Sequence, residues 1–127
     1  AHVHVEPGGS IRALSTVGLG PISLRHEFLD ARLGALEASC VLIGERYLVL
    51  PSARLSARAV PGGIEVATEC FARQVSLALE GTSGAVFEDN YFDLRPHGRR
   101  VIAIVDQAGG HSVAVSCVNG ETLHVTV

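Results

Sequence analysis

Apolar and polar residues alternate along most of this chain with a period of two, which is the pattern of β-strands that bury one face. Turn residues separate most of the alternating runs, at intervals of about 8–12 residues that are typical of sandwiches and barrels. The predicted strands are residues 2–5, 10–14, 22–28, 40–43, 47–50, 55–60, 64–79, 86–94, 101–105, 113–118 and 123–127. We therefore expect an all-β fold, an antiparallel β-sandwich of about seven to nine strands.

The long run that begins at Ile64 changes its phase partway. Ile64 and Val66 place the apolar face on even positions, whereas Phe71 and Val75 place it on odd positions. One regular strand cannot keep both pairs on the same face, because its side chains alternate strictly. A bulge or bend within residues 70–73 would restore the phase, and such features let a chain pass from one sheet to another.

Residues 29–38 are ambiguous between a helix and a β-hairpin or loop. Leu29, Leu33 and Leu36 have helical spacing, but Gly34 interrupts the helical pattern. Both interpretations allow the same apolar contacts, so the sequence leaves both open.

The clearest turn signal is the pair Asn119 and Gly120, since both residues tolerate positive φ and alternating runs flank them. This pair predicts a tight type I′ hairpin between the last two strands. Residues 96–98 (Pro-His-Gly) and 109–110 (Gly-Gly) are weaker signals of the same kind.

Composition narrows the class of protein. The chain has 127 residues, the size of one domain. Its 10 basic residues are all arginine and are scattered, and 13 acidic residues bring the net charge to −3, so it lacks the basic stripe that nucleic-acid binding needs.

No stretch is long and apolar enough to cross a membrane, and no signal-peptide pattern is present. Because Met is absent, we expect a trimmed chain or an excised domain of a larger protein, whose compartment the sequence leaves open.

The potential metal ligands do not amount to a site. His2 and His4 point to the same side of a predicted strand, as two ligands can, and only His124 is a candidate for a third. A solvated strand face is the simpler interpretation. The cysteines share no zinc-type spacing and lie in apolar runs, so we expect buried free thiols, with a disulfide as the alternative in an exported protein. They are Cys40, Cys70 and Cys117. We therefore expect no metal and no other cofactor.

The densest acidic cluster is Glu88, Asp89 and Asp93. A glycosidase needs two carboxyl groups about 5 Å or more apart across a sugar, but adjacent Glu88 and Asp89 point to opposite faces of a strand. The run also lacks the glycine-centred loop of a dedicated calcium site. Nucleophile-elbow and phosphate-loop motifs are absent too. Polar residues that lead into a strand explain the cluster, and no catalytic residue is predicted.

Sugar binding without catalysis would need exposed aromatic rings as platforms. The chain has no Trp, and Phe28, Phe71 and Phe92 lie on apolar phases that assign them to the core. Tyr47 and Tyr91 remain as candidate platforms.

Residues 86–96, Val-Phe-Glu-Asp-Asn-Tyr-Phe-Asp-Leu-Arg-Pro, are a more specific signal. This segment resembles a phrase near the C-terminus of β-mannosidases and related family 2 glycoside hydrolases, in which Asp-Asn-Tyr-Phe-Asp-Leu precedes a Pro-Gly turn and a final strand. Residues 63–66 and 71–77 are similar to the strand before that phrase, and residues 47–51 to an aromatic and leucine strand that ends in proline. The resemblance spans residues 47–105, with Pro-His-Gly in place of the Pro-Gly turn.

This resemblance implies an immunoglobulin-like β-sandwich at the end of a multidomain glycosidase whose catalytic residues lie on a separate (β/α)₈ barrel. It implies a noncatalytic accessory role, in which this chain packs against and supports the catalytic part. The expected partners are the other domains of the parent, and the parent's expected substrate is a terminal β-mannoside. The residues that carry over are structural: Asp89, Asn90, Tyr91, Phe92, Asp93 and Leu94.

Within this phrase the alternation places Phe92 and Leu94 in the core. Asn90 lies on the same side, so we expect it, together with Asp89, to fix the start of this strand by bonding to a neighbouring loop.

Two alternatives to the accessory role remain open at this point. One is an independent carbohydrate-binding or adhesion module, and the other is a structural or interaction domain on the same fold. The parent's substrate also stays open among mannosides, glucosaminides and galactosides.

Overall fold

The computed structural model describes Pro7 and residues 21–34, 36–81, 86–106 and 112–127, and the predicted strands at 2–5 and 10–14 lie outside these ranges. The described residues form ten β-strands and one short 3₁₀ helix, η2 (Glu45–Tyr47). The strands are β1 (Phe28–Leu33), β2 (Leu36–Val41), β3 (Leu55–Val60), β4 (Gly63–Thr68), β5 (Ala72–Leu79), β6 (Val86–Phe87), β7 (Phe92–Leu94), β8 (Arg99–Asp106), β9 (Ser112–Ser116) and β10 (Leu123–Thr126). Within the same ranges, no helix has the length and apolar character to span a membrane.

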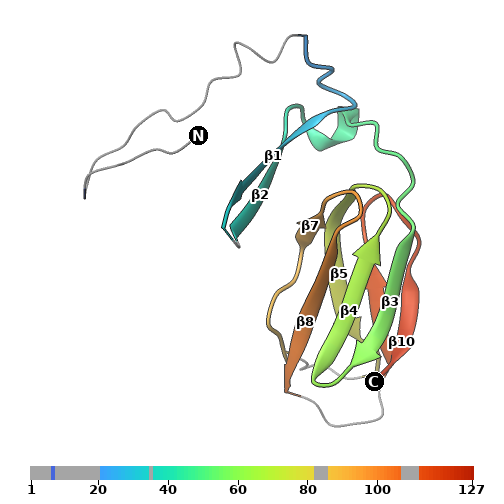
Figure 1. Cartoon of the computed structure of the whole chain (residues 1–127). Helices are drawn as coiled ribbons and strands as arrows, with labels where there is room; N and C mark the ends of the chain where they lie inside the picture. The colour runs from blue at the N-terminus through green and yellow to red at the C-terminus, as the bar shows by residue number, and fades with distance from the viewer. Residues whose placement is uncertain (1–6, 8–20, 35, 82–85, 107–111) are drawn as a thin grey trace.

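Eight of these strands form two four-stranded antiparallel sheets, in the orders β10-β9-β5-β7 and β3-β4-β8-β6. The sheets lie face to face as the two layers of a sandwich (Figure 1). Alternate β-branched residues from both inner faces meet in the core, as the period of two predicts. The largest fully buried side chains are Ile64, Val66, Val75, Ile102, Val113 and Val115. The predicted all-β sandwich is therefore confirmed.

The phase change after Ile64 marks the passage between the two sheets, as predicted. β4 belongs to one sheet and β5 to the other, and the strand is interrupted between them. Between Ala72 and Val75 the pairing of β5 with β7 then shifts register. Gln74 has a φ of 49° at this bulge. The break expected within residues 70–73 is confirmed, and the bulge extends it to Gln74.

Residues 28–41 form an antiparallel hairpin, β1–β2, so the helical alternative for this region is wrong. Gly34 adopts a φ of 61° in the turn, a conformation that costs glycine little and other residues more. Leu33 pairs with Leu36 across that turn. The leucine spacing that mimicked a helix therefore belongs to two strands.

Three other predicted strands are wrong. Residues 86–94 form two short strands, β6 and β7, that belong to different sheets. Residues 22–28 contain a turn in which two main-chain N–H groups donate to the carbonyl of Ser23, each at 3.0 Å. Tyr47 is the last residue of η2, residues 48–50 join no sheet, and Val49 N–H donates to the carbonyl of Arg25 at 2.8 Å. In residues 22–28 and 47–50, main-chain groups form hydrogen bonds within a turn or between two loops, in place of the inter-strand hydrogen bonds of a sheet.

The type I′ hairpin predicted at Asn119 and Gly120 is also wrong. The loop between β9 and β10 spans residues 117–122, and neither Asn119 nor Gly120 has a positive φ. Gly120 N–H donates to the carbonyl of Cys117 at 3.4 Å, while the side chain of Asn119 binds other segments of the sandwich. Those tertiary bonds decide the loop conformation.

At residues 96–98 the chain does turn. Gly98 N–H donates to the carbonyl of Arg95 at 2.8 Å, and His97 has a φ of 58°. Proline in the second position and a positive φ in the third are typical of a type II turn. The signal at residues 109–110 lies outside the described ranges.

Candidate functional site

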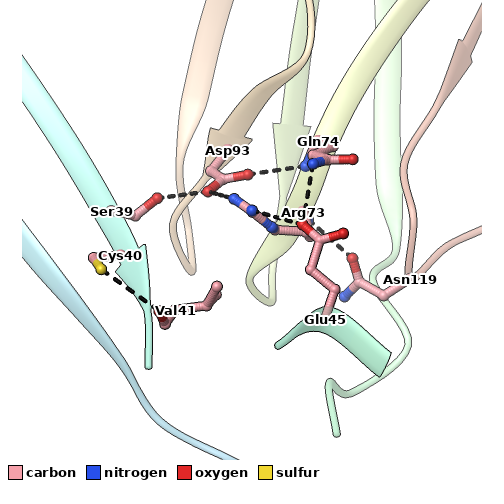
Figure 2. Close-up of polar contacts among 8 residues, drawn as sticks. All are labelled: Ser39, Cys40, Val41, Glu45, Arg73, Gln74, Asp93 and Asn119. Carbon is pink, nitrogen blue, oxygen red and sulfur yellow. Dashed lines mark hydrogen bonds and ion pairs between the residues drawn. The ribbon is translucent and has the colours of Figure 1, made fainter. Parts of the chain in front are cut away.

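The carboxylate of Asp93 in β7 is the centre of a polar cluster that links distant elements (Figure 2). Its Oδ2 accepts hydrogen bonds from the hydroxyl of Ser39 at 2.6 Å and from Nη1 of Arg73 at 2.5 Å. Its Oδ1 accepts the main-chain N–H of Gln74 at 2.9 Å. The alternation of β7 produces this position, because the residues on either side point into the core. Asp93 thus joins hairpin β1–β2 to the bulge of β5.

Arg73 is the cation of this cluster and occupies the bulge of β5. Its Nη2 lies 2.8 Å from Oε1 of Glu45 in η2, while Nη1 contacts Asp93. Burial disfavours the charged form, but hydrogen bonds to Glu45 and Asp93 outweigh it and raise the pKa of Arg73. Its Nε is buried without a hydrogen-bond partner among the described residues. The charged guanidinium therefore ties η2 to the sandwich.

Asn119 completes the cluster from the loop between β9 and β10. Its Oδ1 accepts the main-chain N–H of Arg73 at 2.9 Å, and its Nδ2 donates to the carbonyls of Pro51 and Phe71 at 2.8 and 2.7 Å. One amide thus holds together segments that are 46–68 residues apart in the sequence. Sequence reasoning missed this role, and the turn-forming Asn-Gly pair was the only signal at this position.

The phrase at residues 86–96 forms β6, β7 and the loop between them. Asn90 makes a peptide-like pair with Leu77 of β5: its Oδ1 accepts the Leu77 N–H at 2.8 Å, and its Nδ2 donates to the Leu77 carbonyl at 2.9 Å. Oδ1 of Asp89 accepts a hydrogen bond from the main-chain N–H of Asn90 at 2.8 Å. Its Oδ2 lies 2.5 Å from Nη2 of Arg100. Asn90 therefore bonds to a strand, and not to a loop as expected.

The aromatic residues divide between the core and the surface. Phe92 and Phe71 are buried, and Phe28 stacks on Phe71 with ring centroids 4.0 Å apart. Tyr91 is 73% exposed and has a φ of 59°. A bulky residue at positive φ is rare and costs of the order of 1–3 kcal/mol, so surrounding contacts must hold it.

An open cleft of about 770 Å³ lies between hairpin β1–β2 and strands β7 and β8. Tyr91, Arg95, Arg99 and Arg100 are among its lining residues. Each of the three arginines lies within 3.6 Å of a carboxylate oxygen. The cleft is therefore polar with largely balanced charges, and it suits a hydroxyl-rich ligand better than an apolar one.

The other candidate residues do not gather at this cluster. His2 and His4 lie outside the described ranges, and Nδ1 of His124 lies 3.0 Å from Oε1 of Glu80. Tyr47 is 45% exposed but does not line the cleft. Across the part of the chain that the structure describes, no three His, Cys, Asp or Glu side chains are placed to hold a metal ion.

All three cysteines are free. Cys117 is buried as expected, and burial raises its pKa. Cys70 is partly buried, whereas Cys40 is exposed, so the expectation of buried thiols is wrong for Cys40.

The acidic residues of the phrase serve as hydrogen-bond acceptors for structural partners. Both oxygens of Asp93 are occupied, and Asp89 pairs with Arg100. Glu88 is exposed, and its main-chain N–H donates to Ala103 of β8 at 2.9 Å. This arrangement is suited to holding the hairpin, η2 and both sheets together.

Residues 50–116, more than half of the chain, match the family Ig_mannosidase, described as an Ig-fold domain. The match extends from just before β3 to the end of β9 and includes the bulge and the whole Asp89–Leu94 phrase. No curated protein and no solved structure shows a significant match. The family match confirms the resemblance to mannosidase-like glycoside hydrolases and the immunoglobulin-like fold. This chain belongs to the Ig_mannosidase family of Ig-fold domains.

Proposed function

We propose that this chain is a noncatalytic accessory domain of a β-mannosidase-like glycoside hydrolase. In this proposal it packs against and supports the catalytic part of the enzyme, which hydrolyses terminal β-mannosides. The observation that carries the proposal is the match of residues 50–116 to the Ig_mannosidase family. The resemblance of residues 86–96 to the C-terminal phrase of β-mannosidases points the same way.

The chemistry of the acidic cluster supports a structural role. A retaining glycosidase needs two carboxyl groups about 5–5.5 Å apart that both face the sugar. Asp93 instead accepts three protein hydrogen bonds, and Asp89 is bound to Arg100 and to the main chain. Neither carboxylate is left free to act on a glycosidic bond.

The experiment compares the chain alone with the longer polypeptide that carries it. We expect the chain alone to release no product from p-nitrophenyl β-mannoside, and the longer polypeptide to hydrolyse it. In the longer polypeptide, Asn119→Ala should lower the melting temperature, because it frees three segments at once. Exposed Glu121→Ala is the matched control. Hydrolysis by the chain alone, or a polypeptide without a catalytic barrel, would contradict the proposal.

A second candidate function, carbohydrate binding, is favoured by one observation. Tyr91 is 73% exposed at the cleft, where arginines offer hydrogen-bond donors. Isothermal titration of the chain with β-manno-oligosaccharides tests it. Saturable binding that Tyr91→Ala removes and Tyr47→Ala leaves intact would favour the module, because only Tyr91 lines the cleft. Absence of saturable heat would count against this second function.

A further inference from the structure

Three of the four arginines that line the cleft are gathered around one tight turn. Arg95 directly follows β7, Arg99 and Arg100 begin β8, and the turn at residues 96–98 connects the two strands. The fourth lining arginine, Arg73, is already held between two carboxylates. The cations that can meet a ligand in the cleft are therefore those of the turn.

Arg95 shares its carboxylate with a second arginine. Oε1 of Glu37 lies 3.3 Å from Nη2 of Arg95 and also pairs with Nη2 of Arg32. A charge-assisted N–H···O bond is about 2.7–2.9 Å long, so the contact with Arg95 is a loose one. One negative charge thus serves two guanidinium groups. The Arg95 side chain is 39% exposed and keeps most of its five N–H donors for a ligand.

Arg99 has the same arrangement on the other side of the turn. Its Nη1 lies 3.6 Å from Oε2 of Glu65, whose Oε1 accepts a hydrogen bond from Nε of Arg58 at 2.7 Å. Two arginines again share one carboxylate, and the Arg99 side chain is 66% exposed. The turn therefore presents two guanidinium groups, Arg95 and Arg99, whose charges are only partly neutralised.

Unfavourable backbone conformations also gather at this cleft. In the described part of the chain, the non-glycine residues with positive φ are Gln74 at 49°, Tyr91 at 59° and His97 at 58°. Gln74 and Tyr91 line the cleft, and His97 lies within the turn between Arg95 and Gly98, which also line it. Such conformations persist only where surrounding contacts hold them, and they are typical of ligand-binding sites.

The size and lining of the cleft favour a small polar ligand. Its volume of about 770 Å³ lies within the range of about 300–1,000 Å³ that is usual for small-molecule sites. Tyr91, which is 73% exposed, offers an aromatic ring on which the apolar side of a sugar ring can pack. Ser39 and Gln74 add polar side chains to the lining. These features match a hydroxyl-rich ring that also carries a negative charge.

We propose that the cleft binds an acidic saccharide, a small sugar whose carboxylate or phosphate group is held by Arg95 and Arg99. Guanidinium groups recognise the oxygens of both anions through paired N–H donors. This inference rests on the second candidate function, carbohydrate binding, and names the class of sugar that the site takes. It is independent of the accessory role.

The test is isothermal titration of the 127-residue chain with mannuronic acid, with a phosphorylated mannose and with neutral methyl β-mannoside. Both acidic sugars should bind at least about tenfold more tightly than the neutral one, and added salt should weaken only their binding. Arg95→Gln with Arg99→Gln should lower the affinity for the acidic sugars about tenfold or more, because hydrogen bonds to a charged group are lost. The affinity for the neutral sugar should stay unchanged.

The matched control is Arg46→Gln with Arg54→Gln. It removes the same charge from two exposed arginines that do not line the cleft, so all three affinities should match those of the parent. Melting curves followed by circular dichroism verify that each variant is folded.

Three results would overturn the inference. Equal affinity for acidic and neutral sugars, or an acidic-sugar affinity that Arg95→Gln with Arg99→Gln leaves unchanged, would refute it while carbohydrate binding stands. No saturable heat with any of the three sugars would refute carbohydrate binding and this inference with it. Tighter binding of a hexaglutamate peptide than of either acidic sugar would assign the two arginines to an acidic protein segment instead.

Discussion

The bond pair between Asn90 and Leu77 gives the sharpest prediction of this structure. The side-chain amide of Asn90 acts on β5 like one more peptide of β7, since it bonds to both the N–H and the carbonyl of Leu77 at 2.8 and 2.9 Å. Leu77 is only 3% exposed. Asn90→Ala would therefore leave two main-chain groups at a protected position without their partner.

The expected cost follows from these two bonds. A neutral hydrogen bond contributes about 0.5–1.5 kcal/mol net, so the loss of both should destabilise the fold by about 1–3 kcal/mol. For a domain of this size each kcal/mol lowers the melting temperature by about 3–5 °C. Urea titration followed by circular dichroism measures the change. Exposed Glu88→Ala, two residues earlier, is the control, and it should change the stability by less than about 0.5 kcal/mol.

Amide hydrogen exchange gives the local readout. Leu77 N–H should exchange faster in Asn90→Ala, while amides on the opposite side of β5, which pair with β9, should change only with global stability. If the free energy of unfolding and the Leu77 exchange rate both match those of the parent, the anchoring role of Asn90 is refuted.

Three further predictions concern the core, a close approach and pH. Phe92→Ala should cost about 3–5 kcal/mol in urea unfolding, since the ring is 8% exposed, and a loss below about 1 kcal/mol would contradict its core role. Gly63→Ala would place a Cβ 2.3 Å from a main-chain oxygen of β8, so it should destabilise the sheet by about 1–3 kcal/mol, and a neutral result would argue against this pairing. Hydrogen bonding with Ser112 and His124 lowers the pKa of Glu80 from its ordinary 4.5. The ionised Glu80 therefore stabilises the fold above about pH 4.5, and this stabilisation is lost as the pH falls through the lowered pKa. Glu80→Gln should flatten this part of the melting-temperature profile, and an identical profile would count against it.

Much of the sandwich could be predicted because strand alternation is a local property of the sequence. The opposite phases of Ile64 with Val66 and of Phe71 with Val75 are enough to predict the change of sheet, since a phase shift has few physical explanations. Burial of Phe92 followed from the same rule.

The polar cluster could not be predicted, because its bonds join residues that are distant in the sequence. Arg73, Asp93 and Asn119 each have an ordinary local interpretation, as a strand or turn residue, and only the fold brings them together. Local rules gave a wrong turn where tertiary contacts decide the loop conformation. The Asn-Gly pair predicted a tight hairpin, but the side-chain amide of Asn119 donates to the carbonyls of Pro51 and Phe71 instead.

The accessory role is tested most directly on the natural polypeptide that carries this sequence. An antibody raised against the purified chain allows its isolation from the source, and its length and its hydrolysis of β-mannosides can then be measured. The proposal predicts a polypeptide much longer than 127 residues that hydrolyses β-mannosides through a separate catalytic domain. A free polypeptide of this length without that activity would contradict it.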